Sequence, residues 1–103
     1  MICAHTVRRL KPGMFDEFRE RFTPPVDDAP AGWVRFHMLR SLADENEVVT
    51  FGFFDGTLEQ MNQSQDESDF AKLRESIDPL VDDVVTNGVY EIVESLAVDG
   101  TAA

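Results

Sequence analysis

The residues best suited to chemistry lie within one short stretch of the chain, residues 33–37. Trp33, Arg35 and His37 alternate along a segment typical of a β-strand, so their side chains are expected on one face. His37 could accept a phenolic or enolic proton near neutral pH, and Arg35 could hold the oxyanion that forms. This pattern predicts that the strand face forms one wall of a catalytic site, with His37 and Arg35 as the catalytic residues. The alternative is that both side chains pair with acidic residues at a sheet edge or a dimer contact.

The substrate-binding part of this wall is predicted to extend onto the neighbouring strands. Trp33 and Phe54 could stack on a planar substrate, and Thr50 shares the strand parity of Phe54. Tyr90 could donate a hydrogen bond from the last strand, and His5 is a further candidate whose facing the pattern leaves open. The opposite face, toward the helices, is expected to carry the uniformly apolar positions Val34, Phe36, Met38, Val49, Phe51 and Phe53.

Other kinds of site have no matching pattern in the sequence. The two histidines and the scattered acidic residues lack the spacing of zinc or calcium ligands. There is no Gly-rich phosphate loop, no nucleophile elbow and no cysteine pair. We therefore expect neither a metal ion nor a cofactor.

Hydrophobic periodicity predicts the order strand, helix, strand, strand, helix, strand. Phe15, Phe18 and Phe22 recur at helical spacing before Pro24, and Thr57 with Gln60 fits a capping box at the start of the second helical region. The polar residues 62–67 are predicted to interrupt that region, and Asn87-Gly88 to bend the last strand. The predicted strands are residues 2–9, 33–40, 48–54 and 84–93, and the predicted helical segments begin near residues 14, 57 and 70.

This order is that of a ferredoxin-like β-α-β-β-α-β fold, in which both helices lie on one face of a four-stranded antiparallel sheet. The strands 48–54 and 84–93 are apolar on both faces, yet the helices cover only one. We therefore predict a homodimer packed sheet against sheet, a dimeric α+β barrel. Residues 1–96 are expected to form one domain, and residues 97–103 a flexible tail.

Composition excludes several kinds of partner. A formal net charge of -11 over 103 residues argues against binding to nucleic acid or to an anionic membrane surface. The single cysteine, Cys3, cannot form an intramolecular disulfide, which is consistent with a reducing compartment. No secretory signal and no membrane-spanning segment is recognised, so the cytoplasm is the expected location.

Three segments resemble the dimeric α+β barrel superfamily, which includes antibiotic biosynthesis monooxygenases and stress-responsive barrel domains. They are MICAHTVRRLKPG at residues 1–13, FGFFDGTLEQ at residues 51–60 and IDPLV at residues 77–81. The resemblance implies dimerisation and a pocket between sheet and helices, without a metal or flavin in the protein. His5 matches a histidine of the stress-responsive branch, but residues 65–70 lack the histidine pair found there. Trp33 and Arg35 match the monooxygenase branch by residue type.

Two functions from different classes follow. The first is a cofactor-independent monooxygenase-like enzyme acting on a small aromatic or polyketide-like compound. The second is a non-catalytic dimeric barrel that binds a small ligand or serves as a stress-related protein. A pocket bordered by Trp33, Arg35 and His37 would favour the enzyme.

Overall fold

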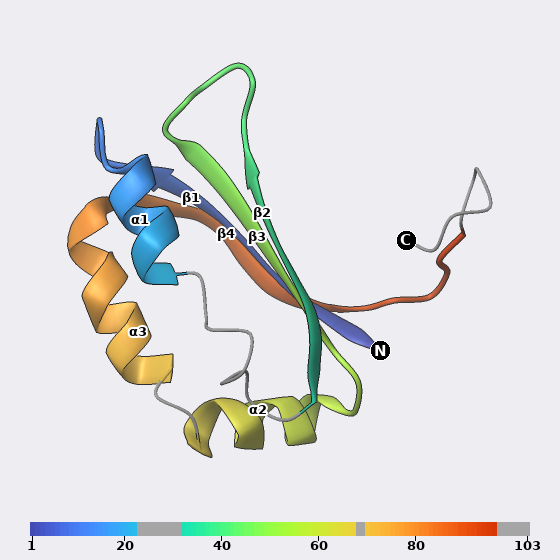
Figure 1. Cartoon of the computed structure of the whole chain (residues 1–103). Coiled ribbons are helices and arrows are strands. Elements are labelled where there is room, and N and C mark those ends of the chain that lie inside the picture. Colours follow the sequence, from blue (N-terminus) through green and yellow to red (C-terminus); the bar gives the residue numbers. More distant parts are fainter. Residues whose placement is uncertain (23–31, 68–69, 97–103) are drawn as a thin grey trace.

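A four-stranded antiparallel sheet with helices on one face forms the fold in the computed structural model, which describes residues 1–22, 32–67 and 70–96 (Figure 1). The sheet order is β2-β3-β1-β4. No helix in the described part of the chain is long and apolar enough to cross a membrane. The elements are β1 (Ile2–Leu10), α1 (Phe15–Phe22), β2 (Trp33–Arg40), β3 (Glu47–Phe54), α2 (Leu58–Glu67), α3 (Phe70–Ile77), the 3₁₀ turn η2 (Asp78–Leu80) and β4 (Val81–Glu91).

The predicted element order and the ferredoxin-like α+β fold class are confirmed. The tail 97–103 and most of the connection 26–32 lie outside the described residues. The three α-helices lie on one side of the sheet, and no described element covers the other side (Figure 1). We call these two sides the helix-side face and the outer face.

The hydrophobic core lies between the sheet and helices α1 and α3. Phe18 and Phe22 of α1 are buried with their rings stacked at 5.3 Å, which confirms the predicted phenylalanine stripe as core. Phe15 packs at the edge of this cluster. The other buried members of the cluster are Leu10, Val48, Ile77 and Leu80.

The loop between β2 and β3 is stabilised by its own polar side chains. The backbone N–H of Asn46 donates to Asp44 Oδ1 at 3.0 Å, and Arg9 of β1 forms an ion pair with the same carboxylate. These hydrogen bonds, first that from Asn46 and then that from Arg9, lower the pKa of Asp44. The loop thereby ties the hairpin to the central strand β1.

Helix α2 differs from the sequence prediction at its C-terminal half. The capping box is confirmed, because Thr57 N–H donates to Gln60 Oε1 at 2.9 Å and Gln60 N–H donates to Thr57 Oγ1 at 3.2 Å. The predicted interruption at 62–67 is wrong, because the helix continues to Glu67. Polarity alone does not end a helix: this segment has no Gly or Pro, and Gln and Glu favour the helical state.

The irregularity in β4 also lies at a different place from the one predicted. Asn87 and Gly88 pair regularly with Thr6 and His5 of β1, so no bulge forms there. Val7 instead pairs with Thr86 and Arg8 with Val84, which leaves Val85 as an extra residue, and a second shift lies opposite Arg9 and Leu10. Asn-Gly occurs in turns but does not require one, and here both residues stay in the ladder.

Candidate functional site

The two faces of β3 are opposite to those predicted. Val48, Thr50 and Phe54 are buried, at 0%, 4% and 3% exposure, while the residues Val49, Phe51 and Phe53 are only partly buried. Val48 belongs to the core under the helices, so its parity defines the helix-side face. Val49, Phe51 and Phe53, predicted toward the helices, therefore lie on the outer face. Hydrophobicity could not distinguish the faces, because both are apolar.

A bulge in β2 divides the predicted catalytic wall. Trp33 pairs with Phe54, but the next pair is Arg35 with Phe53, so Val34 is an extra residue. Because side chains alternate, this extra residue places Trp33 on the helix-side face and Arg35 on the outer face. Val34, expected toward the helices, is 56% exposed at the bulge. Phe36 and Met38 do pack against the core under the helices, as predicted.

The seven predicted site residues consequently form two groups on opposite faces of the sheet. Register and burial place one group on the helix-side face: Trp33, Thr50 and Phe54. The other group lies on the outer face: His5, Arg35, His37 and Tyr90. The structure therefore does not bring the predicted catalytic pair together with its predicted stacking residues within one chain.

The outer-face group centres on Phe51. Both His5 of β1 and His37 of β2 pair with Phe51, so the two histidines flank it from opposite sides. The His5 ring lies 4.7 Å from that of Phe51 and 5.9 Å, edge-on, from that of Tyr90. His37 lies edge-on to Phe53 at 5.7 Å. The sequence did not determine the face on which His5 lies; the structure places it on the same face as His37.

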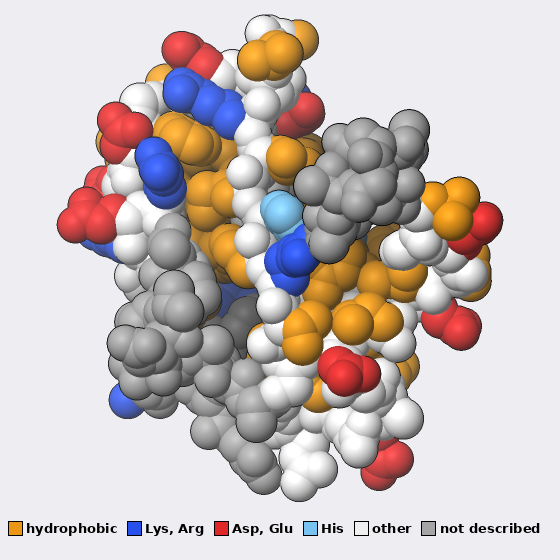
Figure 2. All heavy atoms as spheres, turned by 45° about the vertical axis from the view of Figure 1, so that its right-hand side comes forward, with side chains coloured by type: hydrophobic (Ala, Val, Ile, Leu, Met, Phe, Trp, Pro, Cys, Tyr) orange, Lys and Arg blue, Asp and Glu red, His pale blue; other side chains and the backbone are white. Residues whose placement is uncertain are grey.

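One polar atom of this group has no partner among the described residues. His5 Nδ1 is buried, and within that part of the chain it makes no hydrogen bond. Leaving such an atom unsatisfied costs about 1–3 kcal/mol. The surrounding surface is largely apolar, and Figure 2 shows a histidine and a basic side chain flanked on both sides by hydrophobic side chains.

The helix-side group combines an aromatic pair with a polar one. The Trp33 and Phe54 rings meet edge-on at 5.3 Å, and Trp33 covers Gly52, where an added Cβ would lie 2.6 Å from Trp33 Cζ3. Two residues further along the same face, the buried Thr50 Oγ1 accepts a hydrogen bond from Arg8 Nη1 at 3.0 Å. An aromatic stack and a hydroxyl–guanidinium pair thus share one face of β3.

Arg8 is the residue that the sequence reasoning missed. Its guanidinium lies 5.1 Å from the Phe22 ring centroid and 5.8 Å from that of Phe18, within the layer between sheet and helices. Burial lowers the pKa of Arg8, and Arg74 lowers it further, while Asp78 acts in the opposite direction. The available signal was parity, because Arg8 alternates with the buried Leu10 on β1.

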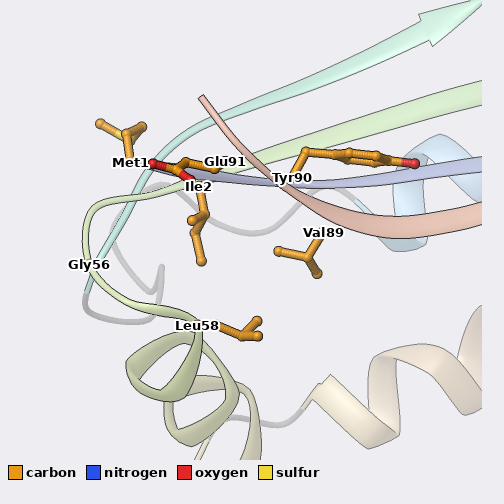
Figure 3. A pocket seen from close by; sticks show the side chains of 7 residues that line it. All are labelled: Met1, Ile2, Gly56, Leu58, Val89, Tyr90 and Glu91. Atoms are coloured by element: carbon orange, nitrogen blue, oxygen red, sulfur yellow. The ribbon is translucent and has the colours of Figure 1, made fainter. Parts of the chain in front are cut away.

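A separate recess of about 390 Å³ lies at the end of the sheet where β1 begins, between β1, β4 and the start of α2 (Figure 3). Ile2 and Val89 extend from the sheet toward Leu58 of α2. Of the predicted site residues, Tyr90 borders this recess, whereas Trp33, Arg35 and His37 do not. Its remaining lining residues are Met1, Gly56 and Glu91.

The contact between Gly52 and Trp33 makes a specific prediction. Gly52→Ala is expected to displace the indole ring and to lower the free energy of unfolding by about 1–3 kcal/mol, the usual cost of overpacking. Trp33 is the only tryptophan, so its fluorescence emission maximum should shift. Gly88→Ala is the matched strand control, because its new methyl group would meet Tyr90 on the outer face. Unchanged emission and stability in Gly52→Ala would contradict this packing.

Comparison with known proteins finds similarity in structure but not in sequence. No protein-family model matches the sequence, and the search of curated proteins finds no significant match. Among solved structures, a candidate antibiotic biosynthesis monooxygenase from Chloroflexus aurantiacus superposes with a TM-score of 0.78 at 12% identity, covering 94% of this chain and 97% of that one. Another candidate antibiotic biosynthesis monooxygenase, from Deinococcus radiodurans, superposes with a TM-score of 0.76 at 14% identity, covering 95% of this chain and 98% of that one.

A third structure is a variant of SnoaB, a cofactor-independent oxygenase from Streptomyces nogalater. It superposes with a TM-score of 0.76 at 15% identity and covers 92% of this chain and 95% of that one. Nearly the whole lengths match in all three cases. The chain therefore has the fold of the antibiotic biosynthesis monooxygenase-like proteins, and the fold implied by the sequence resemblance is confirmed.

Proposed function

We propose that this protein is a cofactor-independent monooxygenase-like enzyme acting on a small aromatic or polyketide-like compound. The observation that carries the proposal is the helix-side arrangement of the Trp33–Phe54 aromatic pair beside the buried Thr50 hydroxyl and its Arg8 partner. Phe54 and Thr50 are themselves buried, so a planar substrate with a polar edge would contact this group through the partly buried Trp33 and Arg8. The fold shared with SnoaB, a cofactor-independent oxygenase, supports the same kind of chemistry.

The chemistry follows from the acidity of such substrates. The phenolic or enolic proton passes to solvent water, because the helix-side group holds no base, and the guanidinium hydrogen-bonded to Thr50 stabilises the oxyanion that results. The electron-rich carbon then reacts with O2. In the overall reaction a CH2 group is oxidised to C=O, one oxygen atom of O2 enters the carbonyl and the other leaves as water. The protein binds and orients the substrate and favours its deprotonated form.

The outer face offers a second location for the same reaction. His37 would be the proton acceptor there and Arg35 the oxyanion partner, with His5 and Tyr90 as binding residues. The observation in favour is that His5 and His37 flank the same residue, Phe51, on that face. If the chain pairs sheet against sheet, this group lies between the two sheets. The catalytic roles of His37 and Arg35 stay a prediction.

Oxygen uptake with a dihydroxyanthrone, without added metal or flavin, tests both locations. Thr50→Val is nearly isosteric and removes the buried hydroxyl, and we expect it to lower kcat/KM about tenfold or more. His37→Ala removes the proton acceptor of the other face. If Thr50→Val loses oxygen uptake and His37→Ala keeps it, the reaction takes place at the helix-side site. If His37→Ala loses oxygen uptake and Thr50→Val keeps it, the reaction takes place on the outer face. No oxygen uptake by the wild type would favour the non-catalytic ligand-binding protein.

We further propose that the chain forms a homodimer through the outer face. The half-exposed Leu39 and Tyr90, at 48% and 53% exposure, accompany the partly buried Phe51 and Phe53 on this face. Exposed apolar areas of this kind are typical of protein–protein interfaces. A sheet-to-sheet twofold pair is the dimeric α+β barrel expected from the sequence.

We propose a cytoplasmic location because Cys3 is a free, buried cysteine. The thiol is buried and free, and burial raises its pKa, so it behaves as an inert apolar side chain. A single unpaired cysteine is consistent with a reducing compartment.

A further inference from the structure

Three basic side chains gather around the centre of the outer face. His5 of β1 and His37 of β2 both pair with Phe51 of β3, so they flank the same ring. Arg35 lies on this face two residues before His37, at a spacing of about 6–7 Å along the strand. His37 and Arg35 are exposed in the single chain, and His5 is partly buried. We call His5, Arg35 and His37 the basic cluster.

No carboxylate of the described residues forms an ion pair with the basic cluster. Two acidic residues of the outer face, Glu47 and Asp83, both pair in register with Arg9, which lies about 13 Å from His5 along β1. The described helices lie on the opposite side of the sheet and bring no charge to this face (Figure 1). The positive charge of the cluster is therefore not compensated within the described part of the chain.

The titratable neighbours that register places beside the cluster in the described strands are Cys3 and Tyr90, which pair with each other. Cysteine and tyrosine side chains are ordinarily neutral in the pH range in which histidine titrates. Near and below neutral pH, the charge at the centre of this face consequently depends on the two histidines.

Beside His5 Nδ1 the described part of the chain offers no acceptor for a second proton. This atom is buried and makes no hydrogen bond there. The His5 ring lies against aromatic groups, with the Phe51 centroid at 4.7 Å and the Tyr90 ring edge-on at 5.9 Å. A neutral imidazole has one donor and one acceptor nitrogen, whereas both nitrogens of the protonated ring are donors. Uptake of a proton therefore adds a charged donor that needs water as its acceptor.

A twofold pair of outer faces places two copies of the basic cluster between the sheets. With neutral histidines each chain contributes one positive charge, that of Arg35, and with protonated histidines it contributes three. These charges repel one another, and each loses hydration when a second sheet covers it. In the separated chain the exposed groups face water, so the added charges are less costly there. Protons bind the separated chains better than the dimer, and by linkage they favour separation.

We propose that the outer-face dimer is pH-sensitive and that His5 and His37 are the groups that respond. The dimer forms near neutral pH and separates into folded single chains as the pH falls toward 5.5. This regulation concerns the homodimer proposed above and rests on it. The sign follows from the linkage: a histidine that gains a proton on separation stabilises the dimer above its titration range, ordinarily near pH 6.5, and destabilises it below.

Sedimentation velocity over a concentration series, at pH 7.0 and pH 5.5 and at one ionic strength, measures the dissociation constant of the dimer. We expect the wild-type constant to rise about fiftyfold or more at the lower pH, because even one histidine per chain that stays neutral in the dimer takes up two protons per dimer on separation. Circular dichroism should be the same at both pH values, which distinguishes separation of folded chains from unfolding.

The decisive variant combines His5→Gln with His37→Gln. These are the only two histidines of the sequence, so the double variant has none, and glutamine keeps a polar side chain that does not titrate. Its dissociation constant should change less than about threefold between the two pH values, since carboxylates titrate mainly below this range. Leu42→His is the matched control, because it adds a histidine at a fully exposed loop position and should leave the wild-type response unchanged.

The outcomes separate the pH dependence from the dimer itself. A wild type that is already monomeric at pH 7.0 overturns both the homodimer and its regulation. A wild-type dimer that is equally stable at both pH values, a response that persists in the double variant, or a loss of secondary structure at pH 5.5 overturns the regulation alone. If the double variant does not fold, His37→Gln decides in its place, and an undiminished response overturns the proposal.

Discussion

Phe18→Ala is expected to lower the free energy of unfolding by about 3–5 kcal/mol, measured by urea denaturation. Phe18 is completely buried, and its ring stacks on Phe22 at 5.3 Å while Arg8 lies 5.8 Å above it. Truncation removes the apolar contacts of α1 with the core and leaves a cavity that the rigid sheet cannot fill. Because a domain of this size is stable by about 5–15 kcal/mol, the variant should lose at least a fifth of its stability.

Two variants on the same helix calibrate this effect. Phe18→Leu keeps most of the buried volume and should cost roughly a third as much as the alanine variant. Phe15→Ala lies one turn earlier, where the ring is only partly buried at the edge of the core, and should also cost less. If Phe15→Ala destabilises the protein as much as Phe18→Ala, the core is not centred where the structure places it.

Much of the fold could be predicted because its signals are local. The phenylalanine stripe of α1 has helical period, and Thr57 with Gln60 caps α2. Each of these depends on residues within about one or two turns. The length of α2 could not be predicted in the same way, because a mostly polar helix has few apolar positions with which to reveal its period.

The candidate site was harder to predict because it depends on which face each residue takes. A strand that is apolar on nearly every position, such as 48–54, contains no clear periodic signal, and one extra residue at Val34 reverses the facing of Trp33 relative to Arg35. Only the pairing of β2 with β3 reveals that bulge. The sequence did not reveal Arg8 for a related reason, because Arg8 and Arg9 are adjacent residues of the same type. In the structure Arg8 lies under the helices, whereas Arg9 forms an ion pair with the loop carboxylate of Asp44.

This separation has a functional consequence. The helix-side group can be assembled by a single chain, because Arg8, Thr50 and Trp33 all lie on strands of one sheet. The outer-face group becomes enclosed only if a second chain covers it. The two candidate locations therefore respond differently to the loss of the dimer: chemistry on the helix side would tolerate it far better than chemistry among His5, His37 and Tyr90.

The dimer itself is tested most directly at Phe51. This residue pairs with both His5 and His37 and so lies centrally on the outer face, away from the helix-side core. Phe51→Glu would remove the apolar contacts of the central ring and place a carboxylate between the two sheets, where taking the charge out of water costs several kcal/mol. Light scattering after gel filtration should then show the particle mass fall from about twice the chain mass of 11.6 kDa to that of one chain.

Leu42→Glu introduces the same charge change in the β2–β3 loop, where Leu42 is fully exposed, and should leave the dimer intact. The far-ultraviolet circular dichroism of Phe51→Glu should match that of the wild type, because the helix-side core is untouched; dissociation with retained secondary structure then identifies the outer face as the interface. A wild type that is monomeric at micromolar concentration, or a Phe51→Glu variant that stays dimeric, would show that the second copy does not bind here.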